Sequence, residues 1–130
     1  FDVTREFVMQ RKAFGQTIAD FQNTQFQMAQ MDAEIEVAQV YLDHCVEMHN
    51  LGKLTANMGA KLKLIGAELE WRMMDLGVQL HGGAGYMQEY DICRMFTDAR
   101  ISRIYAGTSE IMKYILGRDI CSDSYTSIMD

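Results

Sequence analysis

A short run at 106–111, Ala-Gly-Thr-Ser-Glu-Ile, has the residue types of an anion-binding helix start. Glycine releases the backbone, Thr108 can cap a helix, and Ile111 begins an apolar helical stretch. The first amides of a helix have no partner within the helix, so they can donate to a phosphate or a carboxylate. The sequence therefore predicts a site for an anionic group at this helix start.

The segment Gln-Leu-His-Gly-Gly-Ala-Gly-Tyr at 79–86 is rich in glycine and follows a predicted helix. It is not a dinucleotide-binding fingerprint, because that motif follows a strand. Adjacent glycines allow the backbone to come close to a ligand or a partner chain. They also terminate a helix, and the residue types alone favour neither interpretation.

Basic and amide side chains near the N-terminus offer another way to bind an anion. In Arg-Lys-Ala-Phe-Gly-Gln at 11–16, the spacing favours a helix end with Gly15 as its C-cap and the basic pair near the negative end of the dipole. The alternative is an arginine fork for phosphate, formed by Arg11. Asp20 is predicted to be the N-cap of the next helix, and Gln22 donates either to a ligand or to water.

The histidines and cysteines do not have the spacing of a metal site. They are His44, His49 and His81, and Cys45, Cys93 and Cys121. The first two histidines lie on different faces of a helix, and the wide spacing of the cysteines predicts buried, reduced thiols. Arg94 and Asp98 are predicted to form a surface ion pair, and Trp71 to be an anchor in the core or an interface.

The composition is that of one globular domain. The chain has 130 residues, of which 48% are apolar and 23% are charged, and this length can form one core. Twelve basic and eighteen acidic residues give a net charge of −6, which argues against nucleic-acid binding through a basic face. No apolar run reaches the roughly 20 residues of a membrane span. Because the sequence begins with Phe1, we expect a fragment or a processed product.

The absence of proline, together with eleven methionines, predicts an all-α protein. Two series of apolar residues repeat every three or four positions, as on one face of a helix. They are Met28, Met31, Ile35, Ala38, Leu42 and Cys45, and then Met58, Leu62, Ile65, Leu69, Met73, Leu76 and Leu80. A short join at 49–53 makes these long helices antiparallel neighbours. With a helix end at 1–12 and shorter helices near 95–104 and 109–120, we expect one up-and-down helical bundle over residues 1–130.

Four segments, taken in order, resemble the C-terminal domain of the acyl-CoA dehydrogenases. They are Arg-Lys-Ala-Phe-Gly at 11–15, Phe-Gln at 21–22, the segment at 79–86, and a stretch from Asp-Ala-Arg-Ile to Ile-Tyr-Ala-Gly-Thr-Ser-Glu-Ile at 98–111. The resemblance covers nearly the whole chain. It implies the C-terminal third of a flavin enzyme, inactive alone, whose N-terminal helical domain and middle β-domain lie outside this sequence.

The resemblance also implies an activity and its partners. The family oxidises an acyl-CoA thioester to a trans-enoyl-CoA in fatty acid β-oxidation and related lipid metabolism. A glutamate removes the α-proton, FAD accepts the β-hydride, and the electrons pass to an electron-transfer flavoprotein. Members are usually homotetramers with FAD bound across a subunit interface. The expected location is the cytoplasm of a bacterium or the mitochondrial matrix of a eukaryote.

Carried over to this sequence, the resemblance implies three groups of FAD contacts and one substrate contact. Arg11 and Gln22 would contact the FAD of a neighbouring subunit, and Gln79, Leu80, His81, Gly82 and Gly83 would approach it from another chain. Thr108, Ser109 and Glu110 would hold FAD in their own subunit, and Ala106 and Gly107 would border the acyl thioester.

Ala106 occupies the position of the catalytic glutamate in medium- and short-chain members. Alanine cannot accept a proton, so we expect no catalytic residue in this chain. Long-chain and isovaleryl-type members, which the chain resembles here, place the glutamate on the helix before Arg-Lys-Ala-Phe-Gly, upstream of Phe1. Two alternatives stay open: a non-enzymatic helical assembly module, and a relative of the acyl-CoA oxidases.

Overall fold

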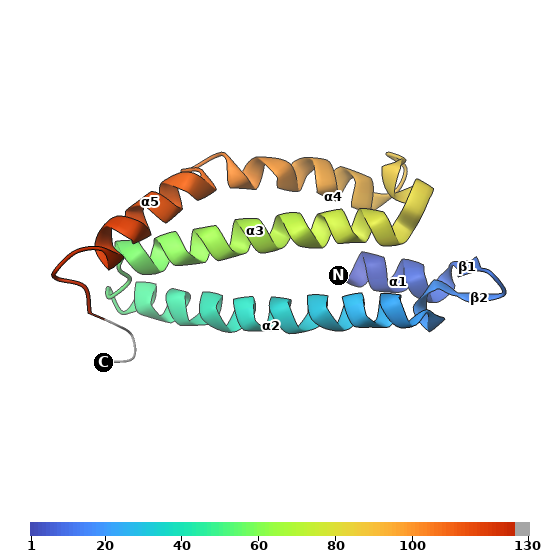
Figure 1. Ribbon diagram of the computed structural model, residues 1–130, viewed down its shortest axis with the longest axis horizontal. Helices are drawn as coiled ribbons and strands as arrows, with labels where there is room; N and C mark the ends of the chain where they lie inside the picture. The colour runs from blue at the N-terminus through green and yellow to red at the C-terminus, as the bar shows by residue number, and fades with distance from the viewer. Residues whose placement is uncertain (127–130) are drawn as a thin grey trace.

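The computed structural model describes residues 1–126 as a bundle of helices with a small β-ribbon at one end (Figure 1). In chain order the elements are α1 (Asp2–Gln10), β1 (Lys12–Ala13), β2 (Gln16–Thr17), η1 (Ile18–Asp20), α2 (Gln22–Asn50), α3 (Ala56–His81), η2 (Gly82–Tyr86), α4 (Asp91–Ala99), η3 (Arg100–Arg103) and α5 (Ser109–Ile120). The predicted all-α bundle is confirmed. None of the helices within residues 1–126 has the length and apolar character to span a lipid bilayer.

The two long helices expected from the apolar series are α2 and α3, which run antiparallel (Figure 1). The core between them contains Met31 of α2 packed with Leu69 and Met73 of α3. Thr55 caps α3, because its hydroxyl oxygen accepts a hydrogen bond from the amide of Met58 at 3.2 Å. Met31 and Met73 of the methionine-rich series are therefore core residues.

The apolar series are only partly covered. Leu42 and Ile65 are 39% and 47% exposed, whereas Cys45 is buried. Figure 1 shows that α1 lies along only one half of α2, so the other half has fewer neighbours. The prediction of buried cysteines holds for Cys45 and is wrong for Cys121, which is exposed.

Helix α3 packs against α1, α2, α4 and α5. Its buried contact residues include Ala60, Ala67 and Gly77. A β-carbon at Gly77 would lie 2.6 Å from Cδ1 of Ile92 and 2.9 Å from Oγ1 of Thr4. The absence of a side chain at this position lets α1 and α4 meet α3 closely.

The predicted helix end at Gly15 is wrong. Helix α1 ends at Gln10, Arg11 is extended, and the chain enters the hairpin formed by β1 and β2. Phe14 and Gly15 form its turn with φ of +52° and +83°, the left-handed backbone that two-residue hairpin turns require. Arg11 is the C-cap of α1, and its backbone amide donates to the carbonyl of Phe7 at 2.9 Å, so the helix end lies at Arg11 instead of Gly15.

The predicted role of Asp20 as the N-cap of α2 is also wrong, because that position is Phe21. The carboxylate of Asp20 accepts hydrogen bonds from the backbone amide and the hydroxyl of Thr17, at 2.8 and 2.7 Å. Asp20 thus stabilises the short helix η1, which turns the chain from the hairpin into α2.

The helix predicted near 95–104 begins earlier, at Asp91, and continues after Ala99 as η3. Its ion pair joins Arg94 to Asp91 instead of Asp98, because Arg94 also donates to the carbonyl of Gln88 and is drawn toward the helix start. On the inner side of this segment, Trp71 of α3 packs against Phe96 with ring centroids 4.8 Å apart. The prediction of Trp71 as a packing anchor is confirmed.

Replacing Gly77 by alanine is expected to lower the free energy of unfolding by about 1–3 kcal/mol, because the added carbon overlaps Ile92 and Thr4. The matched control is Gly66→Ala on the same helix, where nothing lies within 4 Å of an added β-carbon. Alanine at that helical position is expected to raise the free energy of unfolding by about 1 kcal/mol. Chemical denaturation measures both changes, and equal effects would contradict the close packing at Gly77.

Candidate functional site

The start of α5 has the geometry of an anion site. Thr108 is its N-cap, and the threonine hydroxyl oxygen accepts a hydrogen bond from the amide of Ile111 at 3.2 Å. The amides of Ser109 and Glu110 have no backbone carbonyl acceptor inside α5, because no helical turn precedes them. The positive end of the helix dipole adds to their attraction for an anion. The predicted helix start is therefore confirmed.

The carboxylate of Glu110 also lies at the start of α5. Its own backbone amide, followed by the hydroxyl of Thr108, lowers the pKa of this exposed carboxyl. A phosphate arriving there would share these donors with Glu110 or displace it.

The turn before α5 has left-handed backbone at two successive residues. Ala106 has φ of +52° and Gly107 has φ of +96°. Glycine is favoured at position 107 by this backbone conformation, and a β-carbon there would displace the terminal methyl group of Met112, which would lie 2.6 Å away. Ala106 is exposed and presents only a methyl group.

Glu68 of α3 accepts hydrogen bonds from residues on both sides of this turn. Its Oε1 accepts a hydrogen bond from Oγ of Ser109 at 2.6 Å and another from Nε of Arg103 at 2.9 Å. The hydroxyl of Ser109 and then the guanidinium of Arg103 lower the pKa of Glu68. Because Ser109 is 2% exposed, its hydroxyl serves the contact with α3.

Lys63 makes a second contact between α3 and the segment that precedes α5. Its ammonium donates to the carbonyl of Ser102 and lies 5.4 Å from the ring centroid of Tyr105. The sequence reasoning missed Lys63 and Glu68. The sequence feature that could have indicated them is their position on α3, where charged residues lie beside buried ones such as Ala67.

The glycine-rich segment terminates α3, which is one of the two roles that the sequence left open. Gly82 is the C-cap of α3 with φ of +59°. Gly82 and Gly83 are exposed, and nothing lies within 4 Å of a β-carbon built on either. Gly85 is instead buried, and its β-carbon would lie 2.6 Å from the carbonyl oxygen of Val78. Backbone at 82–83 is therefore open to a partner or ligand, while Gly85 is structural.

His81 has a structural environment. It is 5% exposed, and its Nδ1 lies 2.7 Å from the carbonyl oxygen of Gly77. Its ring stacks on Phe7 with centroids 4.1 Å apart, and burial lowers its pKa. Of the neighbouring predicted residues, Gln79 is exposed and Leu80 is half-buried.

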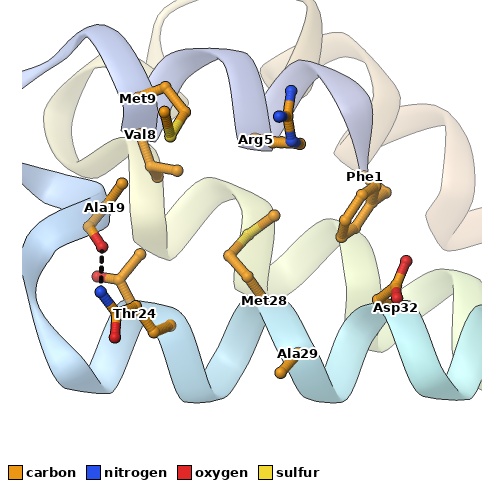
Figure 2. Close-up of a pocket in the computed structure, with 10 residues that line it drawn as sticks. Phe1, Arg5, Val8, Met9, Ala19, Thr24, Met28, Ala29 and Asp32 are labelled. Carbon is orange, nitrogen blue, oxygen red and sulfur yellow. Dashed lines mark hydrogen bonds between the residues drawn. The ribbon is translucent and has the colours of Figure 1, made fainter.

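The predicted site residues lie in two places. Arg11 and Gln22 are exposed and flank the hairpin, which lies with η2 at one end of the bundle, whereas α5 begins farther along α3 (Figure 1). Figure 2 shows a cavity of about 460 Å³ between α1 and α2. None of the predicted site residues lines it. In the part of the chain that the structure describes, no cluster of three or more His, Cys, Asp and Glu side chains has the arrangement of a metal site.

Comparison with known proteins identifies the family. The family model described as acyl-CoA dehydrogenase, C-terminal domain, matches residues 1–121. The mitochondrial long-chain specific acyl-CoA dehydrogenase of Mus musculus is 42% identical over 124 residues, which is 95% of this chain and 29% of that protein. The chain therefore belongs to the acyl-CoA dehydrogenase family and corresponds to its C-terminal domain.

Solved structures agree with this assignment. The acyl-CoA dehydrogenase from Geobacillus kaustophilus matches with a TM-score of 0.90 and 39% identity, covering 93% of this chain and 32% of that one. The butyryl-CoA dehydrogenase from Megasphaera elsdenii matches with a TM-score of 0.89 and 30% identity, covering 93% of this chain and 32% of that one. The chain thus spans just under a third of the length of these relatives.

Replacing Ala106 by glycine is expected to raise the free energy of unfolding by about 1 kcal/mol, because a β-carbon is disfavoured in left-handed backbone. The control is Ala33→Gly in the exposed middle of α2, which is expected to lower it by about 1 kcal/mol. Thermal or chemical unfolding of both variants measures the difference. A lower free energy of unfolding in both variants would contradict the left-handed turn at Ala106.

Proposed function

We propose that this chain is the flavin-binding and assembly domain of an acyl-CoA dehydrogenase of the long-chain or isovaleryl type. The observation that carries the proposal is the start of α5. There, helix amides with no backbone carbonyl acceptor inside α5 follow a left-handed turn in which Ala106 presents a methyl group. The parent protein would oxidise the Cα–Cβ bond of an acyl-CoA thioester, with FAD as its cofactor.

The residues present fit an anionic dinucleotide. The amides at 108–110 suit a phosphate, and the open backbone at Gly82 and Gly83 leaves room for close approach. Arg11 is exposed and caps α1 through its backbone amide, so its guanidinium is compatible with a phosphate fork. FAD, when bound, supplies the hydride acceptor for the substrate β-carbon.

The separation of the two groups of residues supports an oligomer. The start of α5 and the hairpin end lie apart along the bundle (Figure 1). Thr108, Ser109 and Glu110 would hold the cofactor of their own subunit. Arg11 and Gln22, with Gln79 to Gly83, would reach a cofactor held by other copies, in a homodimer or a homotetramer.

We assign the proton-abstracting base to a glutamate outside this chain. The methyl group of Ala106 accepts no proton, and the carboxylate of Glu110 is held by the first amides of α5. The turn at Ala106 and Gly107 would instead border the acyl thioester. A glutamate on a helix N-terminal to α1 would supply the base, and an electron-transfer flavoprotein would receive the electrons.

The relatives are in keeping with the two expected locations, since one is mitochondrial and another comes from a bacterium.

Gly83→Ala in the full-length flavoprotein is expected to weaken FAD binding by about tenfold, which corresponds to about 1.4 kcal/mol. The new methyl group meets nothing within the domain, so the unfolding temperature is expected to stay unchanged. Gly59→Ala on α3 is the control, because its added carbon is also free of contacts and it lies away from the predicted site. Fluorescence titration of the apoprotein with FAD measures the affinities. Equal affinities for Gly83→Ala and the wild type would count against backbone approach at this segment.

A further inference from the structure

We infer that Glu68 is a positioning residue for cofactor binding, acting through the turn at 104–108. The inference rests on the proposed function, because it gives Glu68 a role in aiming the first amides of α5 without contact with the cofactor. Glu68 would do so by holding Arg103 and Ser109, which stand on either side of the turn.

The contacts converge on one atom. Oε1 of Glu68 accepts from Nε of Arg103 at 2.9 Å and from Oγ of Ser109 at 2.6 Å. Arg103 is the last residue of η3 and Ser109 is the first of α5. Both ends of the turn are therefore fixed to a single carboxylate oxygen on α3, the helix that packs against the other α-helices of the bundle.

The turn needs an external restraint. Ala106 adopts left-handed backbone, a conformation that costs an L-residue free energy unless its surroundings impose it. Ile104, Tyr105 and Ala106 are all exposed, so burial of their own side chains restrains the turn weakly. The hydrogen bond from Lys63 to Ser102 restrains the chain before the turn. The chain after the turn is restrained by the hydrogen bond from Ser109 to Glu68.

The direction of the first amides of α5 depends on the hydrogen bond between Ser109 and Glu68. Ser109 is 2% exposed, and its hydroxyl is directed to Glu68 from the first position of α5. Loss of the acceptor would leave a buried hydroxyl unpaired. The first turn of α5 would then rotate or fray, and its free amides would lose their fixed direction.

The test compares three variants of the full-length flavoprotein: Glu68→Ala, Glu68→Gln and the control Glu70→Ala. Glu70 is an exposed carboxylate on the same helix. Glu68→Ala is expected to weaken FAD binding by about tenfold, the effect of losing a hydrogen bond to a charged group. Glu68→Gln keeps an acceptor oxygen for Ser109 and is expected to recover most of the affinity, whereas Glu70→Ala is expected to match the wild type.

Amide hydrogen exchange provides a readout that needs no cofactor. In the apoprotein, Glu68→Ala is expected to accelerate exchange in residues 104–112 and to leave α2 unchanged. If the wild type bound no FAD, the proposed function would fail, and this local acceleration with rescue by glutamine would still establish the positioning of the α5 start. Unchanged exchange, or unchanged FAD affinity in Glu68→Ala, would overturn the inference.

Discussion

The close packing of other helices around α3 is the constraint on which the rest of this structure depends. One helix can accept neighbours on several faces only if it carries small residues where they approach. Ala60, Ala67 and Gly77 meet this need, and Gly77 brings Ile92 of α4 and Thr4 of α1 almost to the backbone of α3. Because α3 extends from the cap at Thr55 to the glycine-rich end, it sets the relative positions of both parts of the candidate site.

The unequal covering of α2 is a consequence of this arrangement. Helix α2 packs on α3, and α1 lies over only one half of it (Figure 1). Val37, Val40 and Val46 are 71%, 65% and 50% exposed. An exposed apolar surface of this kind is typical of contacts with other subunits or domains, and the proposed parent protein would provide both.

The proposed site would attract an anion through the backbone in a protein whose net charge is −6. The amides at the start of α5 and the open glycines at 82–83 contribute no formal charge. Their effect depends on direction, since a helix dipole acts within its first turn. This dependence explains why the hydrogen bonds from α3 to Ser102, Arg103 and Ser109 matter for the start of α5.

The sequence by itself determined the parts of the protein that depend on neighbours a few residues apart. The apolar series specified α2 and α3, Thr108 specified the start of α5, and Ala106 showed that this position lacks a proton acceptor. Such features follow from helical periodicity, capping and residue chemistry, all of which act within about one turn. The ordered motifs also identified the family before any contact was known.

Only the tertiary structure decided how these elements are used. Gly15 has the sequence features of a helix cap, yet it forms a hairpin turn because Phe14 beside it also takes positive φ. Ser109 was predicted to help hold FAD, and only the structure shows that its hydroxyl bonds to Glu68, which lies 41 positions earlier in the chain. Periodicity and spacing carry no information about such a pair, because it exists only when the packing of α3 against α5 brings the two side chains together.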